Sequence, residues 1–166
     1  MLQPVVRRTW GPRGQTPIHK SWDRRERLSA MSAITVSPQR RRLQTYFALR
    51  DHNIVHEDFE KFVSAIIRRL QHRVIAVIDR WAVHRAGAKR LLKRFAKRLE
   101  VEWLPPYAPD INPVEQVWSR SKYADLANYI PADVEELGRA VRASLRRTHG
   151  QQMLLRSFFQ HAKLKL

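Results

Sequence analysis

The sequence predicts an α/β fold, in which a mixed β-sheet is flanked by helices, and three patterns carry this prediction. Residues 28–36 and 43–49 have the composition of β-strands, and the basic turn after Ser37 and Pro38 joins them into a predicted β-hairpin. Apolar residues between 59 and 70 recur at the spacing of an amphipathic helix. The run 74–78 is β-branched and apolar, and it indicates a strand buried on both faces in the middle of the sheet.

The rest of the chain completes this α/β pattern. We expect a helix over about 86–99, a strand over 101–104, a proline-rich turn over 105–109 and a helix from Pro113. Two further helices are expected over about 132–147 and 151–163. A chain of 166 residues with 43% hydrophobic residues can bury one core. We therefore expect a single domain over 1–166, with an irregular basic segment at 1–27 and C-terminal helices at 132–166.

The charge balance indicates a polyanionic partner. Lys and Arg number 32 against 15 Asp and Glu, which gives a net charge of +17. Nucleic acid is the leading candidate, because binding to phosphates releases counterions. A basic surface that serves only solubility and a membrane surface are the alternatives. The absence of cysteine excludes disulfides and cysteine zinc sites, and no signal peptide or membrane span is evident. We expect a cytoplasmic, nucleoid-associated protein.

Two carboxylates occupy positions suited to chemistry. Asp79 follows the strand 74–78, and ligands gather at the carboxyl ends of such strands. Glu115 is the third residue of the helix that begins at Pro113, after a natural N-cap at Asn112. Each residue has a structural alternative: Asp79 could cap the following turn, and Glu115 could close a capping box.

The segment between the two carboxylates favours their convergence. It spans 35 residues and contains a helix, a strand and a rigid turn with three prolines around Tyr107. Mg²⁺ prefers a few carboxylates together with waters and phosphate oxygens. We predict that Asp79 and Glu115 lie within about 8 Å of one another and share a metal site.

Three separate segments carry a family resemblance. Residues 104–118 read LPPYAPDINPVEQVW, residues 77–84 read VIDRWAVH, and residues 8–17 read RTWGPRGQTP. Together, and in this order, they resemble insertion-sequence transposases related to mariner elements. The resemblance implies a ribonuclease H-like fold shared with retroviral integrases. It also implies an Asp-Asp-Glu triad that binds two Mg²⁺ or Mn²⁺ ions for DNA strand cleavage and strand transfer.

By position, the resemblance makes Asp79 the second carboxylate of the triad and Glu115 the third. The first carboxylate belongs to an opening strand upstream of the Arg-Thr-Trp segment, and only eight residues precede Thr9 here. We therefore expect that the opening strand is largely missing, that residues 2–8 pair beside 74–78 as a shortened strand, with a split sheet as the alternative, and that the chain is inactive alone. Substitution for the first carboxylate is not expected from Asp23, Glu26 or Asp51.

The DNA contacts expected from this sequence are cations near the two carboxylates. Lys122 is placed on the same helix face as Glu115, and further contacts are expected from Arg13, Arg80, Lys89 and Lys93. A merely solvated face is the alternative for these cations. The expected partners are transposon ends and target DNA, with a possible homodimer. The alternative function is a non-catalytic, nucleic-acid-binding transposase remnant or basic module.

Five residues are expected to support the site. Asn112 and Pro113 start the helix, and Tyr107 lies in the rigid turn. His84 is expected to orient its loop or cap the next helix, with a proton carrier or an extra metal ligand as the alternative. Trp118 is expected in the core, with a base-stacking platform as the alternative.

Overall fold

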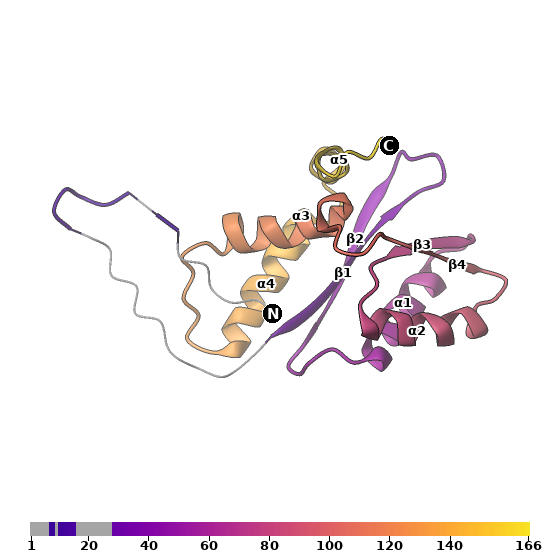
Figure 1. Ribbon diagram of the computed structural model, residues 1–166. Helices are drawn as coiled ribbons and strands as arrows, with labels where there is room; N and C mark the ends of the chain where they lie inside the picture. The colour runs from indigo at the N-terminus through magenta and orange to yellow at the C-terminus, as the bar shows by residue number, and fades with distance from the viewer. Residues whose placement is uncertain (1–6, 9, 16–27) are drawn as a thin grey trace.

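The computed structural model describes residues 7–8, 10–15 and 28–166 (Figure 1). The predicted α/β class is confirmed: two strand pairs are combined with five α-helices in the described part of the chain. The irregular segment predicted at 1–27, Asp23 and Glu26 lie largely or wholly outside the described residues. The same is true of most of the strand predicted at 2–8. None of the described helices is long and apolar enough to cross a membrane.

The hairpin of β1 (Ser29–Val36) and β2 (Leu43–Arg50) forms the wall between two hydrophobic cores. The strands are antiparallel, with Ser29 opposite Arg50 and Val36 opposite Leu43. Because side chains alternate along a strand, Ile34 and Leu43 face one core and Met31 faces the other. Figure 1 shows the hairpin crossing between the two groups of helices.

The first core lies between the hairpin and the C-terminal helices. It is covered by α3 (Pro113–Arg120), α4 (Val134–Thr148) and α5 (Gln152–His161). Leu43, Val141 and Leu155 are completely buried in it. A buried polar link adds to this packing, since the Ser144 hydroxyl donates to Asp125 Oδ2 at 2.7 Å.

The second core lies on the other face of the hairpin. It is built from α1 (His56–Arg69), β3 (Val74–Ile78), α2 (Ala82–Arg94) and β4 (Leu99–Trp103). Ile67 and Leu91 are its most buried members. Gly87 lets α1 and α2 pack closely, because a Cβ atom there would lie 2.6 Å from the Phe59 ring. The strands β3 and β4 are parallel, with Val74 opposite Leu99.

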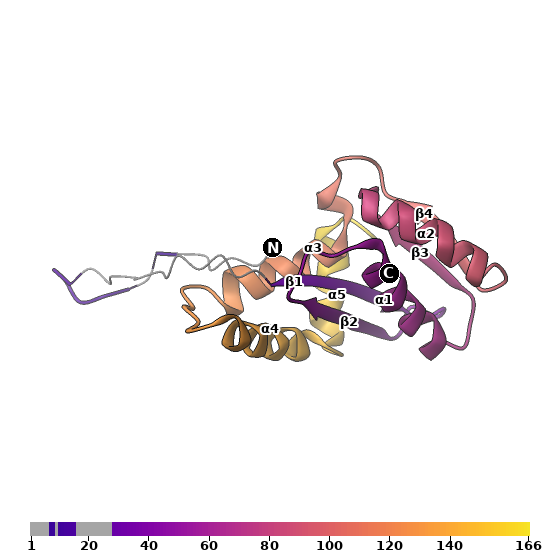
Figure 2. The same ribbon diagram turned by 90° about the horizontal axis from the view of Figure 1, so that it is seen from below.

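The described strands form two separate two-stranded sheets, β1–β2 and β3–β4 (Figures 1 and 2). Arg7, the first described residue, is not in a strand, and its N–H donates to Asn128 Oδ1 at 2.7 Å. The predicted pairing beside β3 is therefore not seen at the described end of the segment 2–8. Within the described residues, β3 keeps one open edge.

The prediction that β3 is buried on both faces is wrong. Ile75 is 63% exposed and Val77 is 62% exposed, whereas Val74, Ala76 and Ile78 pack against the second core. Helices α1 and α2 cover only the inner face of the β3–β4 pair. The helices of the first core pack against the hairpin and not against β3. The face of β3 that contains Ile75 and Val77 is therefore uncovered in the described part of the chain.

Other boundaries differ from the predicted ones in instructive ways. The helix predicted over 86–99 is α2, which begins at Ala82 and ends at Arg94. Leu99 belongs to β4, because it lies opposite Val74 in the parallel pair and the Val74 N–H donates to Arg98 O at 2.7 Å. The remaining predicted helices and strands agree with the structure to within about two residues, as expected for such boundaries.

Candidate active site

Asp79 lies directly after β3, where the chain turns into α2. Its Oδ1 atom accepts a hydrogen bond from the Trp81 N–H at 2.9 Å and another from His84 Nδ1 at 2.6 Å. The turn-capping alternative for Asp79 is thus realised. Capping uses only Oδ1, however, and the side chain is still 48% exposed. A carboxylate oxygen at the end of the strand therefore stays accessible to a ligand.

His84 holds Asp79 in its ionised form. The hydrogen bond from His84 is the largest cause that lowers the pKa of Asp79 below its ordinary value. Burial opposes this shift, and the Trp81 N–H adds to it. The His84 ring also packs against Phe59, with ring centroids 4.5 Å apart, and meets Trp81 edge-on at 5.2 Å. His84 therefore orients the loop after β3, as predicted.

Glu115 lies in the first turn of α3, as predicted from Asn112 and Pro113. The Asn112 side chain accepts from the Val114 N–H at 3.2 Å, and Pro113 is the first helical residue. The Asn112 N–H donates to Pro109 O at 3.0 Å. The capping-box alternative for Glu115 is therefore not realised. Among the described residues, no hydrogen bond or ion pair engages the Glu115 carboxylate, so it is available to a ligand.

The segment between the two carboxylates is held at both ends. Arg80 Nε donates to Leu104 O at 3.1 Å, and this bond ties the end of β3 to the loop that follows β4. The short 3₁₀ helix η1 (Pro109–Ile111) precedes the N-cap of α3. Tyr107 has a φ of 54° and a fully exposed side chain. The turn is thus built by prolines and a left-handed residue, with the Tyr107 ring free of packing.

Lys122 does not continue the α-helix that carries Glu115. Helix α3 ends at Arg120, and a π-helical turn, η2 (Ser121–Asp125), follows it. The argument that Lys122 and Glu115 share a helix face assumes 3.6 residues per turn, and a π-helical turn is wider. The shared face of Lys122 and Glu115 therefore stays a prediction. Lys122 itself is half-buried, and its contact with DNA stays a prediction.

The other predicted site residues have these positions. Lys89 and Lys93 are exposed on α2, and Arg13 is exposed in a turn near the N-terminus. Trp118 packs against the first core, as predicted. Asp51 is an exposed turn residue bonded to His52, and the expectation that it does not replace a catalytic carboxylate stays a prediction.

The donor set at Asp79 and Glu115 suits a hard divalent cation. Both residues offer carboxylate oxygens, and Asp79 is kept ionised. In the part of the chain that the structure describes, neither belongs to a group of three or more metal-binding side chains. Their carboxylate oxygens suit a divalent cation in type, and a complete set of ligands is not seen in the described residues. Their convergence to within about 8 Å stays a prediction.

A comparison with sequence families decides the affiliation of the chain. Residues 1–138 match the family described as DDE superfamily endonuclease. The chain belongs to this family. The predicted resemblance to mariner-related transposases is confirmed at this level, and Asp79 and Glu115 both lie within the matched segment of this DDE endonuclease chain.

A comparison with solved structures supports the predicted fold. The crystal structure of the Mos1 strand transfer complex matches with a TM-score of 0.60 at 14% sequence identity. The match covers 98% of this DDE endonuclease chain and 47% of the Mos1 chain, so the chain spans about half the length of its relative. The ribonuclease H-like fold is thereby confirmed. A search of curated proteins gave no match.

Proposed function

We propose that this chain is a transposase catalytic domain that binds DNA and contributes Asp79 and Glu115 to a divalent-metal site for strand cleavage and strand transfer. The observation that carries the proposal is the state of Asp79. In a chain of the DDE endonuclease family, this residue stands at the end of β3, ionised and fixed by His84. A fixed carboxylate in that position is what metal-dependent phosphodiester chemistry requires.

Each residue has a distinct task in this proposal. Two donors hold Asp79 Oδ1, so Oδ2 is the oxygen that would bind Mg²⁺ or Mn²⁺. Glu115 would bind from the start of α3, after the turn that Arg80 anchors to Leu104. When bound, the metal ions would supply Lewis-acid stabilisation of the phosphoryl oxygens. His84 acts as a positioning residue through Asp79.

The exposed cations next to this loop are suited to DNA. Lys89 and Lys93 lie on α2, the helix whose first turn contains His84, and phosphate contacts from such side chains position DNA without reading its sequence. Arg13, Arg80 and Lys122 are proposed as further contacts. The Mos1 relative is a strand transfer complex. By analogy, transposon ends and target DNA are the proposed substrates, in a homodimer associated with the nucleoid.

A non-catalytic role is the second candidate, and one observation favours it. The described residues offer two carboxylates without a third ligand, while the net charge is +17. A domain of this kind would bind DNA and still lack a complete two-metal site. We propose accordingly that the 166-residue chain does not cleave DNA by itself.

Paramagnetic Mn²⁺ tests the shared metal site without relying on activity. We expect Mn²⁺ to broaden the amide signals around Asp79 and Glu115 over the same concentration range, because one site contains both carboxylates. In Asp79→Asn or Glu115→Gln, broadening weakens at both segments. Glu102→Gln, which removes an exposed carboxylate from β4, is the matched control and leaves the broadening unchanged.

The outcomes separate the two candidate functions. Broadening at only one of the two segments rejects the shared site. No broadening at either segment, together with salt-sensitive DNA binding, supports the non-catalytic candidate. The absence of both broadening and DNA binding rejects the two candidates together.

A further inference from the structure

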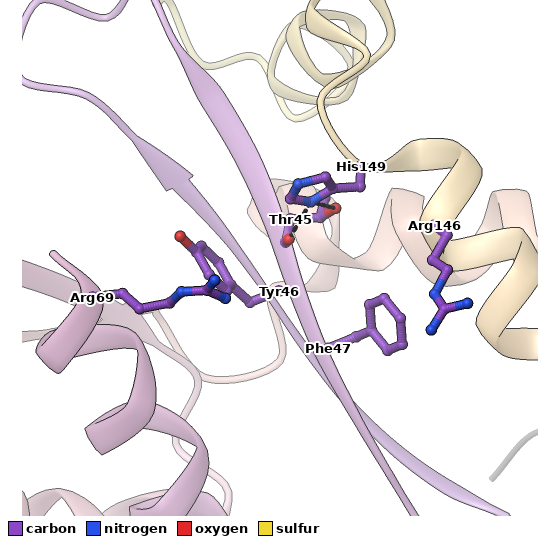
Figure 3. A pocket seen from close by; sticks show the side chains of 6 residues that line it. All are labelled: Thr45, Tyr46, Phe47, Arg69, Arg146 and His149. Atoms are coloured by element: carbon purple, nitrogen blue, oxygen red, sulfur yellow. Dashed lines mark hydrogen bonds between the residues drawn. The ribbon is translucent and has the colours of Figure 1, made fainter.

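A hollow on the outer edge of β2 combines cations with free backbone donors, away from the residues of the candidate active site. Its volume is about 420 Å³, and it is lined by Thr45, Tyr46, Phe47, Arg69, Arg146 and His149. Arg69 reaches toward the strand from α1, and Arg146 reaches toward it from the other side, from α4 (Figure 3). The sequence patterns did not single out any of these six residues.

Side chains already cap part of this edge. Gln152 pairs with Leu43, accepting from its N–H and donating to its carbonyl oxygen, both at 2.8 Å. His149 Nδ1 donates to Thr45 O at 2.8 Å (Figure 3). These bonds show that the backbone of Leu43 and Thr45 points outward. Because direction alternates along a strand, the N–H and carbonyl of Phe47 point outward too.

The backbone groups of β2 that are already hydrogen-bonded exclude a second β-strand as the occupant of this edge. A second β-strand would have to pair with Leu43, Thr45 and Phe47 in succession, but Gln152 and His149 already occupy the first two. A small group can still reach the N–H groups of Thr45 and Phe47. The edge is thus closed to strand addition and open to a compact acceptor.

The charges around this opening select an anion. Arg69 and Arg146 are exposed, and within the described ranges neither guanidinium is paired with a carboxylate. No Asp or Glu lines the hollow. His149 Nδ1 already donates to Thr45 O, so the donors left for an anion are the two guanidiniums and the outward-facing backbone N–H groups. Guanidinium forks and backbone N–H groups together are the donors that recognise phosphate oxygens.

We propose that this hollow binds a backbone phosphate of DNA, as a contact additional to those around Asp79 and Glu115. The proposal rests on the proposed function, because the DNA is the substrate assigned there. Charge complementarity carries the choice of occupant: the net charge is +17, and two guanidiniums that have no carboxylate partner within the described residues lie around a capped strand edge. An acidic polypeptide also offers carboxylates that guanidinium forks can bind, and the competition with poly-glutamate described below separates it from DNA.

A charge-matched pair of variants tests the contact. Arg69→Ala/Arg146→Ala removes the two cations of the hollow. Arg90→Ala/Arg139→Ala removes two exposed arginines whose partners are Glu60 and Glu135, and lowers the net charge equally. Binding of a fluorescent duplex is measured by anisotropy over a range of salt. We expect the first variant to bind roughly 10-fold more weakly than the second, and its salt slope to fall by about 1.

A titration with inorganic phosphate gives a second readout that does not depend on DNA. We expect phosphate to shift the Thr45 and Phe47 amide signals and the His149 ring signals of the wild-type chain, and to leave them unshifted in Arg69→Ala/Arg146→Ala. Circular dichroism checks that both double variants are folded. Neither the Arg69 nor the Arg146 side chain forms a hydrogen bond within the described residues, and the backbone bond from the His149 N–H to Arg146 O does not involve the guanidinium, so the fold is expected to survive.

The failures can be told apart. If wild-type chain binds DNA and the two double variants weaken it equally, the hollow is not a phosphate site and the proposed function stands. If wild-type chain does not bind DNA, the proposed function fails, and the phosphate titration alone decides on the hollow. Poly-glutamate is added at a carboxylate concentration equal to the phosphate concentration of the DNA. If it displaces the DNA, the assignment of the hollow to a phosphate rather than a carboxylate is overturned.

Discussion

At the scale of single residues, Asp58 is a buried charge held by three hydrogen bonds. Its Oδ1 accepts from Arg50 Nε at 2.7 Å, and its Oδ2 bonds to His52 Nε2 at 3.0 Å and to the Val55 N–H at 3.3 Å. Burial alone would raise the pKa of Asp58. The bonds from Arg50, Val55 and His52 outweigh burial and lower it to about 2. Asp58 thereby joins β2 to the start of α1.

This depressed pKa gives a pH-dependent stability. Since the pKa of Asp58 is lower in the folded chain than in the unfolded one, its contribution is present above about pH 4 and is lost as the pH falls toward 2. We expect Asp58→Asn to lower the free energy of unfolding by about 1–3 kcal/mol at pH 7, as measured by urea denaturation.

The same comparison at low pH checks the cause. The difference between wild-type chain and Asp58→Asn is expected to shrink as the pH is lowered from 5 to 2, as two-state urea curves would show. Glu57→Gln, which removes the neighbouring and more exposed carboxylate at the same end of α1, serves as the control for the loss of one negative charge. An undiminished difference at low pH would mean that Asp58 stabilises the chain by packing rather than by charge.

Single residues were also the scale at which the sequence was most ambiguous. Asp79 could be a turn cap or a metal ligand, and the structure shows the cap while leaving Oδ2 open. Glu115 could close a capping box, and the structure shows that it does not. Local sequence patterns describe such alternatives but do not choose between them. The choice depends on His84 and Pro109, whose positions follow from the packed fold.

At the scale of elements, periodicity predicted which segments are helices and which are strands. It did not predict which faces of these elements are covered by neighbouring elements. The apolar spacing of α1 is confirmed, because it follows directly from burial of one helix face. The apolar run of β3 predicted burial on both faces, but Ile75 and Val77 are exposed. Apolar side chains show that a strand could be buried, but not that it is. Burial depends on where the described helices pack.

The open edge of β3 leads to a hydrogen-exchange prediction. Val74 N–H donates to Arg98 O and Ile78 O accepts from the Leu104 N–H, so Val74, Ala76 and Ile78 point their backbone toward β4. Ile75 and Val77 then point theirs toward the open edge. We expect the amides of Ile75 and Val77 to exchange at least about tenfold faster than that of Ala76, measured by NMR.

Ala76 serves as the internal control for Ile75 and Val77, because local unfolding of β3 would expose all three amides to exchange together. Equal protection of all three amides would show that another segment pairs with β3 in solution. In that case the two-sheet arrangement described for β1–β2 and β3–β4 would have to be replaced by a continuous sheet.

At the scale of the whole molecule, the hairpin of β1 and β2 links the two hydrophobic cores. The hairpin of β1 and β2 contributes one face to each core, so it couples the helices that carry Glu115 to those that flank Asp79. The family and fold could be predicted from sequence because three motifs spread along the chain preserve their order. The cationic hollow at β2 could not, since it combines residues more than 100 positions apart.

The surface charge predicts how the DNA affinity of the whole chain depends on salt. With 32 Lys and Arg against 15 Asp and Glu, we expect DNA affinity to fall by orders of magnitude between about 50 and 200 mM salt, because each phosphate neutralised releases counterions. We expect phosphate contacts rather than base contacts to dominate binding, so duplexes of equal length and different sequence are expected to bind within about threefold of one another. Anisotropy titrations at four salt concentrations measure both quantities. A flat salt response would reject phosphate binding as the source of affinity, and a strong sequence preference would show that base contacts add to it.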